Sequence, residues 1–148
     1  MNGLFCVAAH ALVYLDKRGC MLSSEELAAN ICTNPARVRK VMAKLKKAGL
    51  VATKAGNDGG YHLLCAPNEV TLEQIADALE VRFVEPAWHS GAGVDCGCLV
   101  ASGMAGVMDG LFDDLDRRCR ERLSQLSLAD LELQLEQAAA RKETAHGI

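Results

Sequence analysis

The residues of this sequence with the clearest capacity for chemistry are lysines and arginines gathered in one segment. Residues 32–57 hold seven basic residues and no aspartate or glutamate, although the chain of 148 residues has a net charge of −3. Cationic side chains repeated along one surface attract phosphate groups, so a basic segment on an acidic body indicates a polyanionic partner for one face. A helix face that is only solvated is the alternative interpretation.

A second group of candidate residues contains thiols and one imidazole. Cys96 and Cys98 form a Cys-Gly-Cys sequence, and Cys6 and His10 are four residues apart, a spacing that places both on one helix face. Mixed cysteine and histidine sets bind zinc or iron–sulfur clusters, and exposed loop thiols are oxidised readily. We expect no cofactor here, but an iron–sulfur cluster or another metal and redox-sensing thiols stay open. The other cysteines are expected to be packing residues: Cys20, Cys32, Cys65 and Cys119.

The basic segment must be positioned by helices that precede it. Residues 4–17 carry apolar side chains at helical spacing. Ser23 and Glu26 form a capping-box pattern that predicts a second helix ending near residue 31. Asn34 is a good N-cap, and Pro35 suits the first position of a third helix, because a helix leaves that N–H unpaired. The arrangement predicts a helix-turn-helix.

The third helix is amphipathic, and Gly49 is expected to end it. One face is apolar, with Val38, Val41 and Leu45, while basic residues repeat at spacings of three and four on another face: Arg37, Lys40, Lys44 and Lys47. A helix of this kind can enter the major groove of double-stranded DNA, where cations meet phosphates and its first turn meets base edges.

A β-hairpin is predicted directly after this helix. Residues 50–54 and 61–65 are apolar and β-prone, and the sequence AGNDGG between them is rich in turn formers. This hairpin would be the wing of a winged helix. The expected DNA-binding residues are therefore those of the helix-turn-helix and the wing: Ser24, Thr33, Asn34, Pro35, Arg37, Arg39, Lys40, Lys44, Lys54, Gly59, Gly60 and Tyr61. For Tyr61, packing against the third helix is the favoured alternative.

The second half of the chain predicts three further elements. Thr71 and Gln74 form another capping box at the start of a fourth helix, and residues 82–97 form a linker in which Trp88 is expected to fill a domain seam. Residues 99–123 should form a helix about 36 Å long, too long for a small winged domain. We therefore expect it to pack against a second subunit. A final helix follows Ser127, with a frayed tail from Arg141.

Two stretches resemble the winged-helix regulators of the Rrf-two family. They are SSEELAANICTNPARVRKVMAKLKKAGLVATKAGNDGGYHL and PNEVTLEQIADALE. The resemblance implies a homodimer that binds a palindromic DNA operator, usually as a repressor. Members with an iron–sulfur cluster carry three cysteines before the dimer helix, whereas this loop has two. The TNPARVRK sequence is most similar to a subgroup without a cluster.

The expected fold class is mainly α (α+β). Residues 1–80 would form a winged helix-turn-helix DNA-binding domain, residues 81–98 a linker or sensor loop, and residues 99–148 the dimerisation and C-terminal helices. A winged helix that docks a protein partner instead of DNA is the alternative, and its basic outer face argues against it.

Two other classes are disfavoured by what the sequence lacks. It carries no phosphate-binding glycine loop, no framed carboxylate pair and no nucleophile elbow, so we do not expect an enzyme. It has no apolar run of about 20 residues and no signal pattern, so we expect a cytoplasmic protein without a membrane partner.

Overall fold

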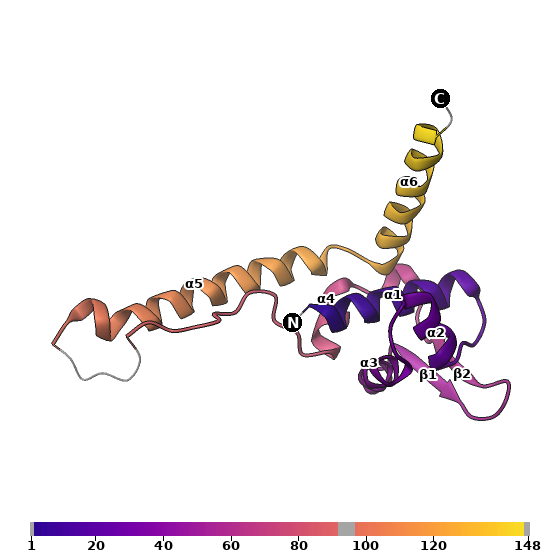
Figure 1. Cartoon of the computed structure of the whole chain (residues 1–148), viewed down its shortest axis with the longest axis horizontal. Helices are drawn as coiled ribbons and strands as arrows, with labels where there is room; N and C mark the ends of the chain where they lie inside the picture. Colours follow the sequence, from indigo (N-terminus) through magenta and orange to yellow (C-terminus); the bar gives the residue numbers. More distant parts are fainter. Residues whose placement is uncertain (1, 92–96, 147–148) are drawn as a thin grey trace.

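The computed structural model describes residues 2–91 and 97–146 and contains six α-helices and one two-stranded sheet. Figure 1 shows a small domain from which one long helix extends. The elements, in chain order, are α1 (Gly3–Arg18), α2 (Ser24–Ile31), α3 (Pro35–Lys47), β1 (Val51–Lys54), β2 (Gly60–Leu63), the 3-10 turn η1 (Pro67–Glu69), α4 (Leu72–Ala78), α5 (Leu99–Ser124) and α6 (Leu128–His146). The predicted winged-helix class, mainly helical with a small sheet, is confirmed.

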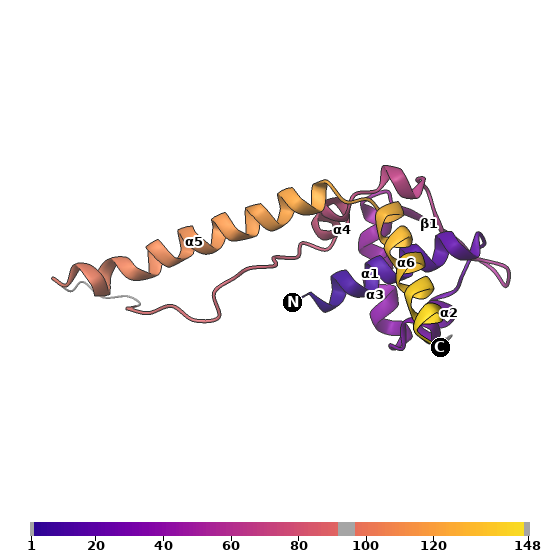
Figure 2. The ribbon, with the colours of Figure 1, turned by 90° about the horizontal axis from the view of Figure 1, so that it is seen from above.

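The hydrophobic core lies where α1, α2, α3 and α4 meet. Its largest fully buried side chains include Leu12, Leu27, Met42, Leu45 and Ile75, one or more from each of these helices. Leu128 at the start of α6 is also fully buried, so the last helix returns to the domain and completes its core. Figure 2 shows α6 crossing α1.

The helix starts follow the predicted capping chemistry. The backbone N–H of Glu26 donates to Ser23 Oγ at 3.2 Å, and Glu26 Oε2 accepts from the Ser23 N–H at 2.7 Å. Thr71 and Gln74 form the same reciprocal pair at the start of α4. Because each box satisfies two backbone donors that a helix start leaves open, these residues determine where α2 and α4 begin.

The hairpin is held against the rest of the domain by a third chain segment. β1 and β2 pair antiparallel from Val51 opposite Leu63 to Lys54 opposite Gly60. Leu22 then bonds to Tyr61 through both backbone groups, at 2.8 and 3.2 Å. Gly60 has φ +145°, and a Cβ there would lie 2.5 Å from the Leu22 carbonyl oxygen. Only glycine suits this position, because both the backbone angle and the close approach exclude a side chain.

The start of the linker is fastened to the C-terminal half of α5, which is the half nearest the domain. Asp116 accepts hydrogen bonds from the backbone N–H groups of Phe83, at 2.7 Å, and Val84, at 3.0 Å. Burial disfavours the charge of Asp116, but these two donors and the Arg120 guanidinium together lower its pKa. Arg120 also donates to Asp77 and to the Val81 carbonyl. The end of α5 nearest the domain is therefore held in a defined direction.

Three expectations about packing and helix length are wrong. Trp88 is 77% exposed and fills no domain seam, because it lies beside the outer part of α5, near Met108 and Phe112. Cys20 and Cys32 are exposed, since the first follows the end of α1 and the second is the C-cap of α2. α6 continues past Arg141 to His146, because no helix-breaking residue interrupts it.

Candidate nucleic-acid interface

The packing of α3 determines which of its basic side chains face outward. Val38, Val41, Met42 and Leu45 are buried on the domain side. With 100° between successive residues, the positions opposite this buried face are the exposed residues Ala36, Lys40, Ala43 and Lys47. This outward face is smooth, because small alanines alternate with the two lysines along it. A smooth cationic face suits close approach to a groove.

The basic residues beside this face are held by neighbours within the domain. Arg39 Nη1 donates to Glu25 Oε1 at 3.1 Å and to Ser24 Oγ at 3.2 Å. Lys46 Nζ donates to Thr53 Oγ1 at 2.8 Å. These contacts tie the middle and end of α3 to α2 and to the wing.

The opposite flank of α3 faces α1 and α4. Lys44 Nζ lies 3.1 Å from Glu80 Oε2, just beyond the end of α4. The Arg37 guanidinium lies close to Gly3, where a Cβ would be 2.8 Å from Nη2. Within residues 2–91 and 97–146, Lys40, Lys47 and Lys54 form no ion pair. Their charges are therefore free for phosphate.

The start of α3 is built as expected, and its cap is occupied. Asn34 Oδ1 accepts from the Arg37 backbone N–H at 2.8 Å, and Pro35 takes the first helical position. Ser24 is only 7% exposed and bonds to Arg39 and Glu25, an arrangement that favours positioning Arg39 over direct contact with DNA. Thr33 is half-buried in the turn before the helix.

The wing places one cation at its outer end. Lys54 is exposed at the end of β1, opposite Gly60. Gly59 allows the turn to close, since a Cβ there would lie 2.0 Å from the Lys54 carbonyl oxygen. Tyr61 is half-buried and packs against the core. Figure 1 shows the hairpin and α3 on the same lower side of the domain.

The cysteine and histidine candidates are not brought together in the described part of one chain. Cys6 and His10 are exposed on α1, and His10 Nε2 bonds to Asn30 Oδ1 at 2.8 Å. Cys98 precedes α5, whose first turn lies at the far end of the molecule from the domain (Figure 1). Cys96 lies outside the described residues. Among the residues described, no three histidine, cysteine or acidic side chains form a metal-binding group. Within the described residues, Cys6, His10 and Cys98 therefore do not form one metal centre.

Cys98 nevertheless has a distinctive environment. It is the exposed residue at the N-cap of α5. Backbone N–H groups lower the pKa of its thiol through hydrogen bonds, with the larger effect from Ala101 and the smaller from Val100. A helix start stabilises a thiolate in this way, and the thiolate is the reactive form of cysteine.

Sequence reasoning did not include the whole outward face of α3 among the candidates. Ala43 was not predicted to contact DNA, and Lys47 was placed on the basic face but not among the expected contact residues, although both share the face of Lys40. The signal was present in the sequence. Taking the four apolar positions of α3 as the inward direction and counting 100° per residue identifies the opposite face.

Three helices, a hairpin packed beside the third helix, and a cationic outward face on that helix define a winged-helix DNA-binding protein. The model of the Rrf2 family, described as iron-dependent transcriptional regulators, matches residues 2–132. The chain therefore belongs to the Rrf2 family of transcriptional regulators, and the predicted family is confirmed. This membership also makes it a regulator and not an enzyme.

Individual relatives agree with this membership. YwnA of Bacillus subtilis, named as an HTH-type transcriptional regulator, is 28% identical over 133 residues, which are 88% of this chain and 96% of YwnA. A crystal structure described as a transcriptional regulator from Lactobacillus plantarum has a TM-score of 0.83 at 27% identity, covering 99% of this chain and 98% of that one. T. potens IscR shares the fold, with a TM-score of 0.67, 21% identity and coverage of 93% and 89%.

The search for membrane spans gives a negative result for the described residues. Their helices are not long and apolar enough to cross a bilayer.

Proposed function

We propose that this chain is a homodimeric repressor that binds a palindromic operator through the outward face of α3. The observation that carries the proposal is the free cationic face of Lys40 and Lys47, beside a wing that carries Lys54. Lysines without an internal partner can neutralise phosphates, and this neutralisation supplies most of the non-specific affinity of a protein for DNA.

A dimer would explain the form of the operator. Two copies related by a two-fold axis would present two α3 helices about one DNA turn apart, so each half-site would mirror the other. The exposed apolar residues of α5 support this proposal, because such a surface normally marks an interface. A bound dimer over a promoter would exclude polymerase, and we therefore propose repression.

We further propose that the signal is oxidation of the loop thiols and not loss of a resident cluster. The support is the exposed position of Cys98 at the start of α5 and the lowered pKa of its thiol. The Cys98 thiolate would attack a peroxide and take one of its oxygens as a sulfenic acid, while the rest of the peroxide is released as water or an alcohol. A second thiol such as Cys96 would then attack the sulfenic sulfur and release water, which forms a disulfide.

The experiment compares DNA binding of the full chain with that of a Lys40→Ala/Lys47→Ala variant. Bound genomic fragments provide the operator, and fluorescence anisotropy measures its affinity between 50 and 200 mM salt. Each neutralised phosphate contributes a slope of about −0.9, and the variant dimer lacks four lysines. We therefore expect it to lose about three to four units of salt slope and at least ~10-fold in affinity for all DNA.

The matched control is Arg141→Ala, which also removes positive charge but lies on α6, on the other side of the domain from α3 (Figure 1). We expect its slope and affinity to equal those of the unmodified protein. An unchanged salt slope in the double variant would show that Lys40 and Lys47 of α3 do not contact DNA.

A further inference from the structure

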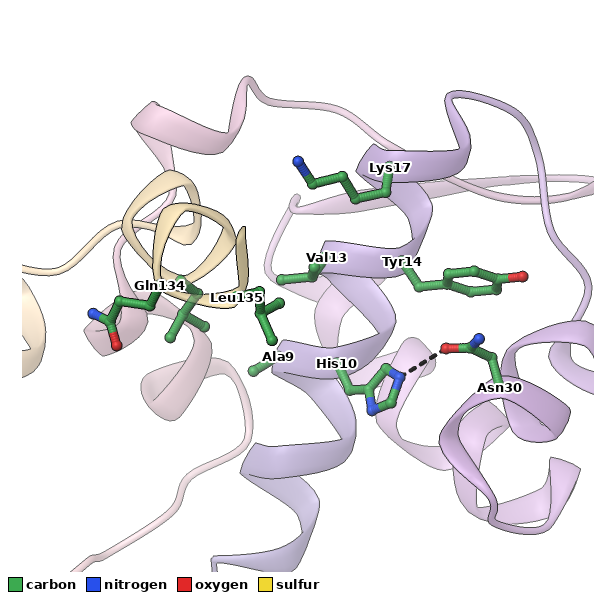
Figure 3. Close-up of a pocket in the computed structure, with 9 residues that line it drawn as sticks. Ala9, His10, Val13, Tyr14, Lys17, Asn30, Gln134 and Leu135 are labelled. Carbon is green, nitrogen blue, oxygen red and sulfur yellow. Dashed lines mark hydrogen bonds between the residues drawn. The ribbon is translucent and has the colours of Figure 1, made fainter. Parts of the chain in front are cut away.

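A pocket of about 490 Å³ lies between α1, α6 and the C-terminal end of α2 (Figure 3), and no residue of α3 lines it. Its walls are mostly apolar, with Ala9 and Val13 from α1 and Leu131 and Leu135 from α6. Pockets that hold small molecules have this size and character, with a few polar groups that orient the ligand. The volume suits a ligand of one or two rings.

The polar groups of the pocket favour a neutral ligand. Lys17 is the only lysine or arginine in the lining, and its ammonium is already bonded to Glu136 Oε1 at 2.6 Å, with Glu132 Oε2 at 4.0 Å. A charged ligand would therefore leave water without gaining a free counter-charge, which is unfavourable beside apolar walls.

The His10–Asn30 pair indicates which neutral group would fit. A carbonyl oxygen only accepts, so the 2.8 Å contact between His10 Nε2 and Asn30 Oδ1 requires a proton on Nε2. In that tautomer Nδ1 is an acceptor, and the amide N–H groups of Asn30 are donors. A hydroxyl group both donates and accepts, so it can bond to either side chain.

The pocket also touches the element that leads into α3. Asn30 is near the end of α2, four residues before Asn34, the N-cap of α3. A molecule between Asn30 and α6 would hold α2 against α6 and so change the freedom of the turn between α2 and α3. Occupancy and DNA affinity would then be linked, because a ligand shifts any equilibrium between states that it binds differently.

We propose that this pocket is an effector site for a neutral, mainly apolar small molecule that carries a hydroxyl group. Its effect on DNA rests on the function proposed above, whereas the binding itself does not.

The first test uses three naphthalene probes with one shared apolar body. They are 2-naphthalenemethanol, 2-naphthoate and 2-naphthylmethylammonium, and isothermal titration calorimetry measures their binding to the full chain without DNA. We expect the alcohol to bind at least ~10-fold more tightly than either ion, a difference of about 1.4 kcal/mol. Equal or tighter binding of an ion, or no binding of the alcohol, would overturn the ligand class.

Two leucines of α6 provide a matched pair for locating the site. Leu135 lines the pocket and is 56% exposed, whereas Leu133 is 53% exposed and is not part of the lining. We expect Leu135→Ala to weaken binding of the alcohol at least ~5-fold, because it removes apolar contact area, and Leu133→Ala to leave it unchanged. Both side chains are half exposed, so neither change endangers folding. Equal effects of the two variants would place the ligand elsewhere.

The regulatory part is tested by operator affinity with and without 2-naphthalenemethanol. We expect a change in affinity for the unmodified protein and for Leu133→Ala, and a reduced change for Leu135→Ala. Binding of the alcohol with no change in DNA affinity would reject the effector role. If DNA binding itself proved independent of Lys40 and Lys47, the calorimetry would still decide the pocket on its own.

Discussion

At the scale of single residues, the availability of a basic side chain on α3 for phosphate depends on its partner within the domain as well as on its charge. Arg39 is held by Glu25 and Ser24, and Lys44 by Glu80, whereas Lys40 has no ion pair within the described residues. Exposed ion pairs are weak, about 0–1 kcal/mol, so phosphate can compete for Arg39 and Lys44. The free lysine, however, loses no internal contact when DNA binds.

Cys98 gives the first prediction at this scale. Because backbone N–H groups lower the pKa of its thiol, we expect peroxide to oxidise it before the other exposed thiols. Treatment with peroxide should then change operator affinity, and Cys98→Ser should abolish that response. Cys20→Ser is the control, since it removes another exposed thiol from the far side of the chain. If peroxide still changed the operator affinity of Cys98→Ser, another residue would be the redox sensor.

Glu132 gives a prediction about pH. It is 9% exposed at the contact between α6 and α1, and burial, followed by the neighbouring Asp16 carboxyl, raises its pKa against the opposing charge of Lys17. Its Oε1 is buried and has no hydrogen-bond partner in the described chain. A pKa raised in the folded state means that folding favours the protonated acid. Its contribution to stability is therefore greatest below the ordinary glutamate pKa and is lost as pH rises through the raised value.

We expect Glu132→Gln to remove this dependence, because the amide stays neutral at every pH. Urea unfolding midpoints between pH 4 and pH 8 should fall less for the variant, which should be the more stable protein at pH 8. Glu143→Gln, an exposed change on the same helix, should follow the unmodified protein. Parallel curves for Glu132→Gln and the unmodified chain would contradict the assignment.

At the scale of elements, hydrogen bonds from side chains determine where α2, α3 and α4 begin, and the packing of the hairpin requires glycine at position 60. Gly60→Ala would force a side chain into φ +145° and to within 2.5 Å of the Leu22 carbonyl. We expect a loss of about 2–3 kcal/mol in unfolding free energy, since such a backbone angle alone costs about 1–3 kcal/mol.

Gly49→Ala separates the two causes for this loss. Gly49 also has a positive φ, +78°, but no atom lies within 4 Å of a Cβ built there. Its substitution should therefore cost only the backbone strain, about 1 kcal/mol. If thermal or urea unfolding showed equal losses of unfolding free energy for the two variants, the close approach of β2 to Leu22 would contribute nothing to the effect of Gly60→Ala.

At the scale of the whole molecule, α5 leaves the domain with an apolar stripe uncovered. Five exposed or partly exposed residues at spacings of three and four form this stripe: Val100, Met104, Val107, Leu111 and Leu115. Met108 and Phe112 lie outside this stripe and line a pocket with Trp88 and His89 of the linker. The stripe is therefore the part of α5 that we assign to the second copy.

Val107→Glu tests this assignment. Val107 is 70% exposed in the single chain, so the change should leave its folding intact. In a dimer, it would bury an unpaired carboxylate, and we expect the dissociation constant to rise at least ~100-fold. Light scattering after size-exclusion chromatography measures the mass. Ser124→Glu adds the same charge outside the stripe and should remain dimeric; a dimer in both variants would reject α5 as the interface.

The sequence by itself determined the local elements of this protein. The capping boxes at Ser23 and Thr71, Pro35 at the start of α3, and the glycine-rich turn act through bonds between neighbours in the chain, so their effect is visible in the order of residues. The order of these elements predicts the winged-helix class, and the basic segment is visible directly in the sequence. The proposed domain boundaries and the DNA-contact residues stay predictions.

Only the tertiary structure decided which way these elements face. It brought Lys44 to Glu80, left Trp88 exposed, and returned α6 to α1 so that a pocket forms beside Asn30. The physical reason is that rotation of a helix and the docking of a distant helix depend on how all buried side chains fill one core. That packing joins residues more than a hundred positions apart, such as Lys17 and Glu136, and no local pattern encodes it.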